Sequence, residues 1–369
     1  MGRTRIRTFV DLLETAKAKG PKTVAIAAGA QAESMLAGLD AEVAGLAEVI
    51  LVGDSSRIKQ IAAEQDFDIS RMDLVHQPDP REAAGQVMKL VSEGQADIAM
   101  KGKVETSDFL RAALRKDLGL RTGRLFTHVA TFEIPDFDRL IFISDAGVVV
   151  APDLEQKVQI VQNAIYVAHA LGINLPRVAV LAATEVVNPK IPTTLDAANL
   201  SKMADRGQIK GGLVDGPLAL DNAISPESAR IKGIRSEVAG YADILIAPDI
   251  EAGNVLAKAI TYFAQGKMAG VVVGARCPLI LPSRSDTRQV RLLRGRRSLR
   301  PRHDLERPVE LHERGQQPTE HRRIAFQLRF PGLRLGFQRH EPEDDRFEIA
   351  TVDRQGQVRI FRLESLDVG

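Results

Sequence analysis

The feature that most constrains the fold is a regular alternation, through the first 287 residues, of short apolar segments with amphipathic stretches. The apolar segments are rich in Val, Ile or Leu and are usually followed by Gly, Asp, Ser or Pro. Fully buried parallel strands have this character, and the stretches between them predict helices that cover a sheet. The sequence therefore predicts an α/β fold with mostly parallel sheets. The expected strands span residues 24–29, 48–53, 98–102, 140–147, 178–183, 211–216, 243–249, 270–275 and 279–283.

The expected strands fall into two groups, which predict two domains. The segment Phe132–Arg139 breaks the alternation between the groups. The last two expected strands follow the second group in sequence, and we expect them to cross back to the first. This predicts a discontinuous first domain, residues 1–131 plus 272–287, around a second domain of residues 132–271.

Residues 288–369 differ in composition from the rest of the chain. They hold 18 Arg, no Lys, 13 acidic residues and only two alanines, whereas residues 1–287 carry a net charge of −3. An arginine cluster of this kind can bind nucleic-acid phosphates. The favoured hypothesis is instead a shifted reading frame of a GC-rich gene, with Thr287 close to the last residue in the original frame. We expect the segment to be poorly ordered, although the alternation over 347–365 is compatible with a small hairpin.

Several classes of protein are disfavoured by what the sequence lacks. No apolar run reaches the ~18–20 residues of a membrane helix, and the charged N-terminus argues against secretion. The single cysteine, Cys277, excludes an internal disulfide and is expected to be an inert packed thiol, so a cytoplasmic location is expected. There is no GxxxxGK[ST] loop and no GxGxxG after the first expected strand. His128 and His169 show no metal-ligand spacing, and both are expected to be structural.

Small or acidic residues recur where the expected strands end. Ligands of open parallel sheets bind outside the carboxyl ends of the strands, so these residues are candidate site positions as a set. Any one of them is also an ordinary turn residue, because Gly and Asp are common in loops. The set comprises Gly29, Gly53, Gly102, Asp145–Gly147, Asp215–Gly216, Pro248–Asp249 and Ser283–Arg284.

Six motifs in chain order resemble one family. They are MKGKVETSDFLRAALRK (100–116), SDAGVVVAPDLEQKVQIVQNA (144–164), EVVNPKIPTTLDAANLSKMADRG (185–207), DGPLALDNAIS (215–225), APDIEAGNVLAK (247–258) and LPSRSDT (281–287). Together they are similar to the phosphate acetyltransferase and phosphate butyryltransferase family. The sequences of two of them, DGPLALDNAIS and LPSRSDT, are closer to the butyryltransferase branch. The resemblance covers most of residues 20–287 and none of the segment after them.

The resemblance implies a fold and a reaction. The fold would be two α/β/α domains with mostly parallel sheets and an inter-domain cleft, usually as a homodimer. The reaction would be the reversible transfer of a short acyl group between CoA and inorganic phosphate, with CoA as a substrate and no bound cofactor or metal. Family members place a Ser at the reacting carbonyl or leaving group and the next Arg on the phosphate, and Ser283 and Arg284 match this pair.

The chemistry of such a transfer accounts for the pair. A planar guanidinium binds two oxygens of a phosphate dianion at once, which suits Arg284. The thioester oxygen gains charge in the transition state and needs a donor, which suits Ser283. The CoA thiol also needs a base or a positive neighbour. In acetyltransferase members, an acidic residue that follows the Ser-Arg pair acts as this base. The corresponding position here is Val290, so the sequence does not identify a base. Asp249 is only a weak candidate.

For each further candidate for binding CoA or phosphate, an ordinary structural role is also possible. Arg111 can reach a CoA phosphate or be a solvated helix residue, and the same holds for Lys101 and Lys103. Gly253 and Asn254 stand at an expected helix start, where free N–H groups suit an anion or an ordinary cap. Asp215 and Gly216 are expected to shape a turn near the cleft.

Two other functions remain open from the sequence alone. One is a metal- and NAD-dependent decarboxylating hydroxyacid dehydrogenase, in which Asp145, Asp215 and Asp249 would hold Mg²⁺ or Mn²⁺. The other is a nucleic-acid binder acting through residues 288–369, although the scarcity of aromatic residues makes a nucleic-acid partner unfavoured.

Overall fold

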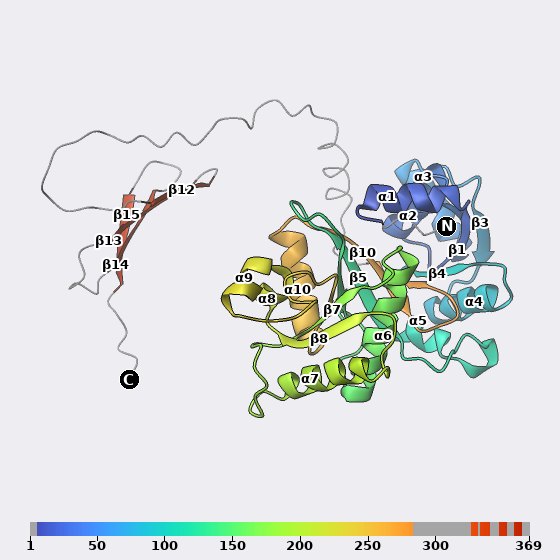
Figure 1. Cartoon of the computed structure of the whole chain (residues 1–369). Coiled ribbons are helices and arrows are strands. Elements are labelled where there is room, and N and C mark those ends of the chain that lie inside the picture. The colour runs from blue at the N-terminus through green and yellow to red at the C-terminus, as the bar shows by residue number, and fades with distance from the viewer. Residues whose placement is uncertain (1–5, 283–325, 331–332, 340–346, 353–357, 364–369) are drawn as a thin grey trace, which may run out of the picture. The chain divides into compact units, whose positions relative to one another are not determined.

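A computed structural model of the chain describes residues 6–282 and four strands within 326–363 (Figure 1). Contacts divide the chain into two units, Met1–Leu299 and Arg300–Gly369. Ser283, Arg284 and the arginines between 288 and 302 lie outside the described residues.

The first unit is built on one sheet of eleven strands, and its outer strands run parallel to their neighbours. Antiparallel pairs occur only in the middle, between β11 and β10, β10 and β5, and β5 and β6. This confirms the predicted α/β class with a mostly parallel sheet. In spatial order the strands are β3 (Asp73–His76), β2 (Ala47–Gly53), β1 (Lys22–Ala27), β4 (Ile98–Lys101), β11 (Leu279–Ile280), β10 (Lys267–Val273), β5 (Thr127–Glu133), β6 (Ile141–Ser144), β9 (Ile244–Ile246), β7 (Arg177–Leu181) and β8 (Leu213–Leu218).

All nine expected strands are present in this sheet, which also holds two strands that were not predicted. The first, β3, is a four-residue edge strand, DLVH, with no fully buried residue, so it lacks the apolar run of its neighbours. The second, β5, has the sequence THVATFE. Its residues are mostly buried, but Thr, His and Glu interrupt the apolar run by which a buried strand is recognised. A prediction based on apolar runs therefore missed this central strand, because the strand contains polar residues.

The sheet is continuous across the predicted domain boundaries. The predicted boundary between residues 131 and 132 lies inside β5, and the one between residues 271 and 272 lies inside β10. These two strands pair over their whole length, from Lys267 opposite Glu133 to Val273 opposite Thr127. On one side of this pair lie β3, β2, β1, β4 and β11 from the first expected domain, and on the other side lie β6, β9, β7 and β8 from the second. The division into two domains stays a prediction.

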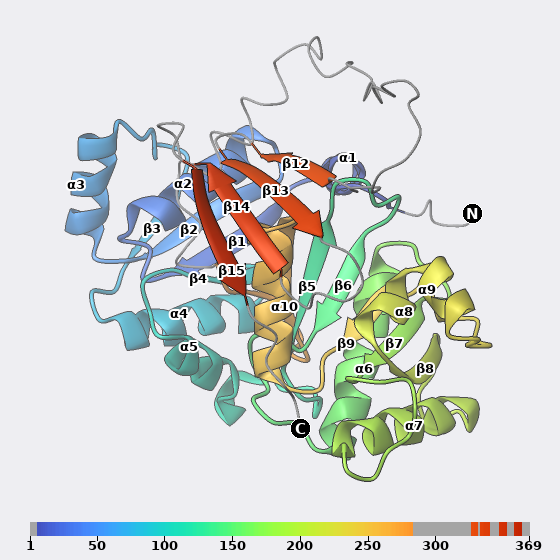
Figure 2. The same cartoon turned by 90° about the vertical axis from the view of Figure 1, so that its left-hand side faces the viewer.

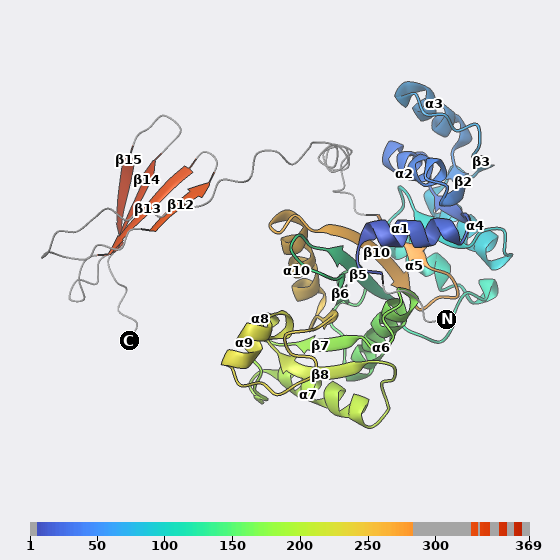
Figure 3. The ribbon, with the colours of Figure 1, turned by 45° about the horizontal axis from the view of Figure 1, so that its top comes forward.

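Helices cover both faces of each half of the sheet. In the first half, α4 and α5 pack on the face of Ala25 and Ala27, while α2 and α3 pack on the face of Ile26. In the second half, α6 and α7 lie on one side of β7 and β8, with α8 and α9 on the other side (Figure 3). The helices are α1 (Phe9–Ala18), α2 (Ala32–Val43), α3 (Ser55–Gln65), α4 (Pro80–Ser92), α5 (Thr106–Ala113), α6 (Leu154–Ala170), α7 (Pro192–Asp205), α8 (Leu220–Ile224), α9 (Pro226–Ile231) and α10 (Ile250–Tyr262).

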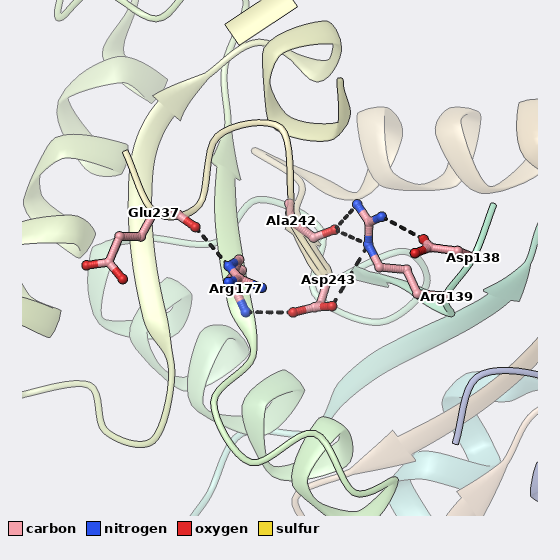
Figure 4. Close-up of polar contacts among 6 residues, drawn as sticks. All are labelled: Asp138, Arg139, Arg177, Glu237, Ala242 and Asp243. Carbon is pink, nitrogen blue, oxygen red and sulfur yellow. Dashed lines mark hydrogen bonds and ion pairs between the residues drawn. The ribbon is translucent and has the colours of Figure 1, made fainter. Parts of the chain in front are cut away.

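A buried carboxylate fastens the start of the second half of the sheet. Asp243, which is 1% exposed, accepts the backbone N–H of Arg177 at 2.9 Å, where β7 begins. The guanidinium of Arg139 lies 4.0 Å from the same carboxylate and donates to the carbonyl of Ala242 (Figure 4). Because Asp243 precedes β9 and Arg139 precedes β6, the network ties three strands together where they start.

The second unit contains a sheet of four antiparallel strands in chain order (Figure 2). They are β12 (Phe326–Phe330), β13 (Leu333–Arg339), β14 (Phe347–Val352) and β15 (Val358–Leu363). The pairing of β14 with β15 corresponds to the hairpin that the alternation over 347–365 permits.

Candidate functional site

Two neighbouring cavities meet at the carboxyl ends of β4 and β11, where parallel sheets bind ligands. The first has a volume of about 300 Å³ and the second about 310 Å³, and both are lined by Lys101 and Pro282. The first is also lined by Gln31, Glu33, Ser34, Ala37, Met100, Gly102, Lys103, Val104 and Glu105. The second is also lined by Thr106, His128, Ala146, Gly147, Asn254, Ala257, Lys258, Thr261, Tyr262, Met268 and Leu281.

The end of β4 lies very close to the end of β1, and a glycine makes this possible. The backbone N–H of Gly102 donates to the carbonyl of Ala27 at 2.8 Å, and a Cβ on Gly102 would collide with the carbonyl oxygens of Ala27 and Ala28. The neighbouring Lys101 is 6% exposed, and its Nζ donates to the carbonyl of Val104 at 3.1 Å. A lysine is thereby held at the wall that the two cavities share.

The opposite wall of the second cavity is set by the corner after β6. Asp145 is 2% exposed, and its Oδ1 accepts the backbone N–H groups of Gly147 at 2.7 Å and of Val148 at 2.8 Å. Its Oδ2 accepts the backbone N–H of His128 at 2.8 Å. The Oγ of Ser144 donates to the carbonyl of His128 at 2.9 Å. The corner thus fixes His128, the second residue of β5, against the end of β6.

The ring of His128 occupies a space that two glycines leave open. A Cβ on Gly147 would lie 3.5 Å from its Nδ1, and a Cβ on Gly270 of β10 would lie 2.6 Å from its Nε2. Burial lowers the pKa of His128 because it disfavours the imidazolium, and the Asp145 carboxylate opposes this only in part. Nδ1 is buried and has no hydrogen-bond partner among the described residues.

Helix α10 supplies the third wall. Gly253 packs against the corner so closely that a Cβ would collide with the carbonyl oxygen of Asp145. One turn of the helix further on, Lys258 lines the cavity, and Tyr262 follows at the end of the helix. The Nδ2 of Asn254 donates to the carbonyl of Ala146 at 3.3 Å, which joins the helix start to the corner.

Several candidates named from the sequence line these cavities. Lys101, Gly102 and Lys103 line the first, and Lys101, Ala146, Gly147 and Asn254 line the second. Arg111 on α5 is exposed and donates to Asp108 at 2.6 Å. Asp249 is the N-cap of α10, since its side chain accepts the N–H of Ala252 at 2.8 Å.

Two more of the predicted residues, Asp215 and Gly216, lie in β8 at the edge of the sheet, where the Asp215 side chain accepts the N–H of Gly216 at 2.8 Å. The functional roles predicted for all of these residues stay predictions. Pro282, which directly precedes Ser283 in the sequence, lines both cavities.

Sequence reasoning missed His128 and Lys258 as cavity residues. The glycines that make room for the His128 ring lie on β10 and after β6, so no local spacing links them to β5. His169 behaves as predicted, because its Nε2 bonds to the carbonyl of Gly211 at 2.7 Å. Cys277 is buried, and burial raises the pKa of its thiol to about 11, which agrees with an inert packed thiol.

Two kinds of feature have no candidate in the described part of the chain, namely a metal cluster and a membrane-spanning helix. No group of three or more His, Cys, Asp or Glu side chains is arranged there to hold a metal ion. Likewise, none of the helices within residues 6–282 combines the length and the apolar character that crossing a membrane requires.

Comparisons with known proteins agree on one family. The sequence profile described as Phosphate acetyl/butaryl transferase matches residues 80–291. A phosphate butyryltransferase of Clostridium acetobutylicum is 47% identical over 287 residues, which is 78% of this chain and 95% of that protein. A phosphate acetyltransferase of Rhizobium meliloti is 44% identical over 281 residues, 76% of this chain and 89% of that protein. A solved branched-chain phosphotransacylase from Enterococcus faecalis V583 shares the fold with a TM-score of 0.66 and 31% identity, covering 74% of this chain and 96% of that one.

Proposed function

The chain belongs to the Phosphate acetyl/butaryl transferase family, and from this premise we propose that it transfers a short acyl group reversibly between CoA and inorganic phosphate. The observation that carries the proposal is the extended match to phosphate acyltransferases, which spans almost the full length of the Clostridium acetobutylicum butyryltransferase. The dehydrogenase and the nucleic-acid binder receive no support, because the family and both named relatives are acyltransferases.

We assign the reacting groups to the edge of the sheet where the two cavities meet. Phosphate attacks the thioester carbonyl, the C–S bond breaks, and the CoA thiolate leaves. Lys101 and Lys258 supply positive charge at the second cavity, which suits a phosphate and a leaving thiolate. The proposed Ser283 and Arg284 follow directly after Pro282, which lines both cavities.

The decisive experiment measures phosphate-dependent release of free thiol from acetyl-CoA and butyryl-CoA. We expect thiol release that requires phosphate and that a thiol reagent detects, with acyl phosphate formed in equal amount. Hydrolysis without phosphate is the background to subtract. No turnover on any short acyl-CoA, with the protein folded, would contradict the proposal.

Three finer assignments also remain proposals. CoA acts as a substrate, and no bound cofactor takes part in the chemistry. The chain forms a homodimer, as the family resemblance implies, which light scattering at several concentrations tests. The single cysteine supports a cytoplasmic location, which fractionation of the source cells tests.

A further inference from the structure

The half-buried imidazole ring of His128 lines the second cavity. The Nδ1 of His128 has no hydrogen-bond partner among the described residues, whereas His169 bonds to a carbonyl. Buried polar atoms in folded proteins are normally paired. No described residue therefore fixes which ring nitrogen carries the proton, and the ring lines a cavity where it can exchange that proton with a ligand. The backbone N–H of His128 is bonded to Asp145 and its carbonyl to Ser144, so the position from which the ring projects is fixed.

We propose that the imidazole of His128 is the base that takes the thiol proton of CoA when the sulfur attacks an acyl phosphate. The proposal rests on the proposed function and names a catalytic group for it. As the C–S bond forms, the thiol proton passes to the imidazole, and the C–O bond to phosphate breaks with its electron pair leaving on the phosphate oxygen. The imidazolium then loses its proton to solvent or phosphate. In the reverse direction it protonates the departing thiolate.

The other acidic or basic groups near the cavity are unsuited to this task. Both oxygens of Asp145 accept backbone N–H groups, so that carboxylate is committed to the corner after β6. Asp249 caps α10. Among the described residues that line the cavity there is no carboxylate, and the ionisable groups besides His128 are Lys101, Lys258 and Tyr262.

The surroundings keep the imidazole neutral and favour a thiolate. Lys101 from β4 and Lys258 from α10 line the same cavity, and the Asp145 carboxylate accepts the backbone N–H of His128. Burial disfavours the imidazolium, and the Asp145 carboxylate opposes this only in part. The two lysines that line the cavity supply positive charge, which stabilises a sulfur anion. A neutral imidazole at neutral pH is the form that a general base requires.

Kinetics of His128→Gln test the proposal when the protein turns over. We expect kcat to fall by about 10²- to 10⁴-fold in both directions while the KM for CoA changes little, and the acidic limb of the kcat/KM pH profile to disappear. His76→Gln is the matched control, because His76 is exposed on β3 outside both cavities, and its activity should be unchanged. A His128→Gln enzyme with the wild-type rate and pH profile would overturn the role.

A second variant moves the ring without removing it. Gly270→Ala places a methyl group 2.6 Å from the present position of Nε2, so the ring must shift. We expect kcat to fall with little change in thermal unfolding, since the displaced group is the end of a side chain. An unchanged kcat in both Gly270→Ala and His128→Gln excludes His128 as the base.

A measurement without turnover separates this proposal from the proposed function. In the full chain labelled with ¹³C-histidine, the His128 resonance is the one of seven that His128→Gln removes. We expect it to move on addition of CoA and to move much less with desulfo-CoA, which lacks the thiol. Equal shifts with both compounds, or none, contradict the proposal. CoA binding with a thiol-dependent shift but no phosphate-dependent turnover would instead refute the acyltransferase function.

Discussion

The Oδ2 atom of Asp145 accepts the backbone N–H of His128 at 2.8 Å, which joins the end of β6 to the start of β5. The other carboxylate oxygen holds the loop that follows, through Gly147 and Val148. One buried side chain therefore shapes the corner that forms a wall of the second cavity. The corner also positions the ring that we propose as the base.

We expect Asp145→Asn to lower the free energy of unfolding by about 2–4 kcal/mol, because it replaces charge-assisted hydrogen bonds with weaker ones and turns an NH₂ group toward N–H donors. Urea denaturation measures the loss. Asp73→Asn, at an exposed position that begins β3, is the control and should change little. Equal stabilities of the two variants would show that Asp145 does not hold the corner.

We expect the carboxyl group of Glu133 to make a pH-dependent contribution to the stability of the fold. Burial raises the pKa of its carboxyl, but the Lys267 ammonium and the backbone N–H of Phe9, at 2.6 Å, together lower it below its usual value. A carboxyl whose pKa is lower in the folded than in the unfolded protein stabilises the fold above the unfolded pKa. That stabilisation is lost as the pH falls through the folded pKa.

Glu133→Gln should therefore cost about 1–2 kcal/mol at neutral pH, with the difference from wild type shrinking toward acid pH. Unfolding curves at several pH values measure it. Glu48→Gln, at an exposed position of β2, should show no such trend. A penalty for Glu133→Gln that does not vary with pH would contradict the linkage.

Gly102→Ala tests the close approach of β4 to β1. The added methyl group meets the carbonyl oxygens of Ala27 and Ala28, which belong to the backbone and cannot move aside, so we expect a loss of about 2–3 kcal/mol. Gly85→Ala within α4 is the matched comparison, because its nearest neighbour is the mobile end of Arg115. Removing a helical glycine should stabilise by about 0.5–1 kcal/mol. Thermal unfolding that ranks the two variants in the opposite order would refute this.

The sequence was informative wherever one property of a segment determined its structure. Apolar runs located the strands because parallel strands are buried on both faces. Two of the predicted strand ends, Gly102 and Gly147, line the cavities. The same rule also selected Asp249, whose side chain is used by a local cap. Strand ends alone do not distinguish these cases, because the distinction depends on which loops face each other.

The cavity residue His128 illustrates what the sequence could not provide. Its environment is set by glycines on two other segments and by a carboxylate on a third, and none of these contacts has a sequence spacing that marks it. His128 and His169 were equivalent from sequence. They differ in the structure because one ring meets a carbonyl and the other meets a cavity.

The proposed Ser283–Arg284 pair makes a kinetic prediction. Arg284→Lys replaces a guanidinium that binds two oxygens with a point charge, so we expect the KM for phosphate to rise by about tenfold or more. Ser283→Ala should lower kcat by about 10²–10³-fold, because one donor to the transition-state oxygen is lost. Arg57→Lys, at an exposed position of α3, is the control. Unchanged KM and kcat in the first two variants would remove the pair from the site.

The composition of the segment after Thr287 predicts a frame-shifting defect in the gene. The family match ends at residue 291, close to where lysine and alanine become scarce and arginine abundant. A shifted frame accounts for both changes at once, whereas a selected nucleic-acid arm accounts only for the arginines. We therefore expect resequencing to find an insertion or deletion near the codon for Thr287. We also expect a chain with the restored frame to exceed this one in solubility or in rate. An uninterrupted frame in the source DNA, or identical melting temperatures and rates of the two chains, would make the hypothesis wrong.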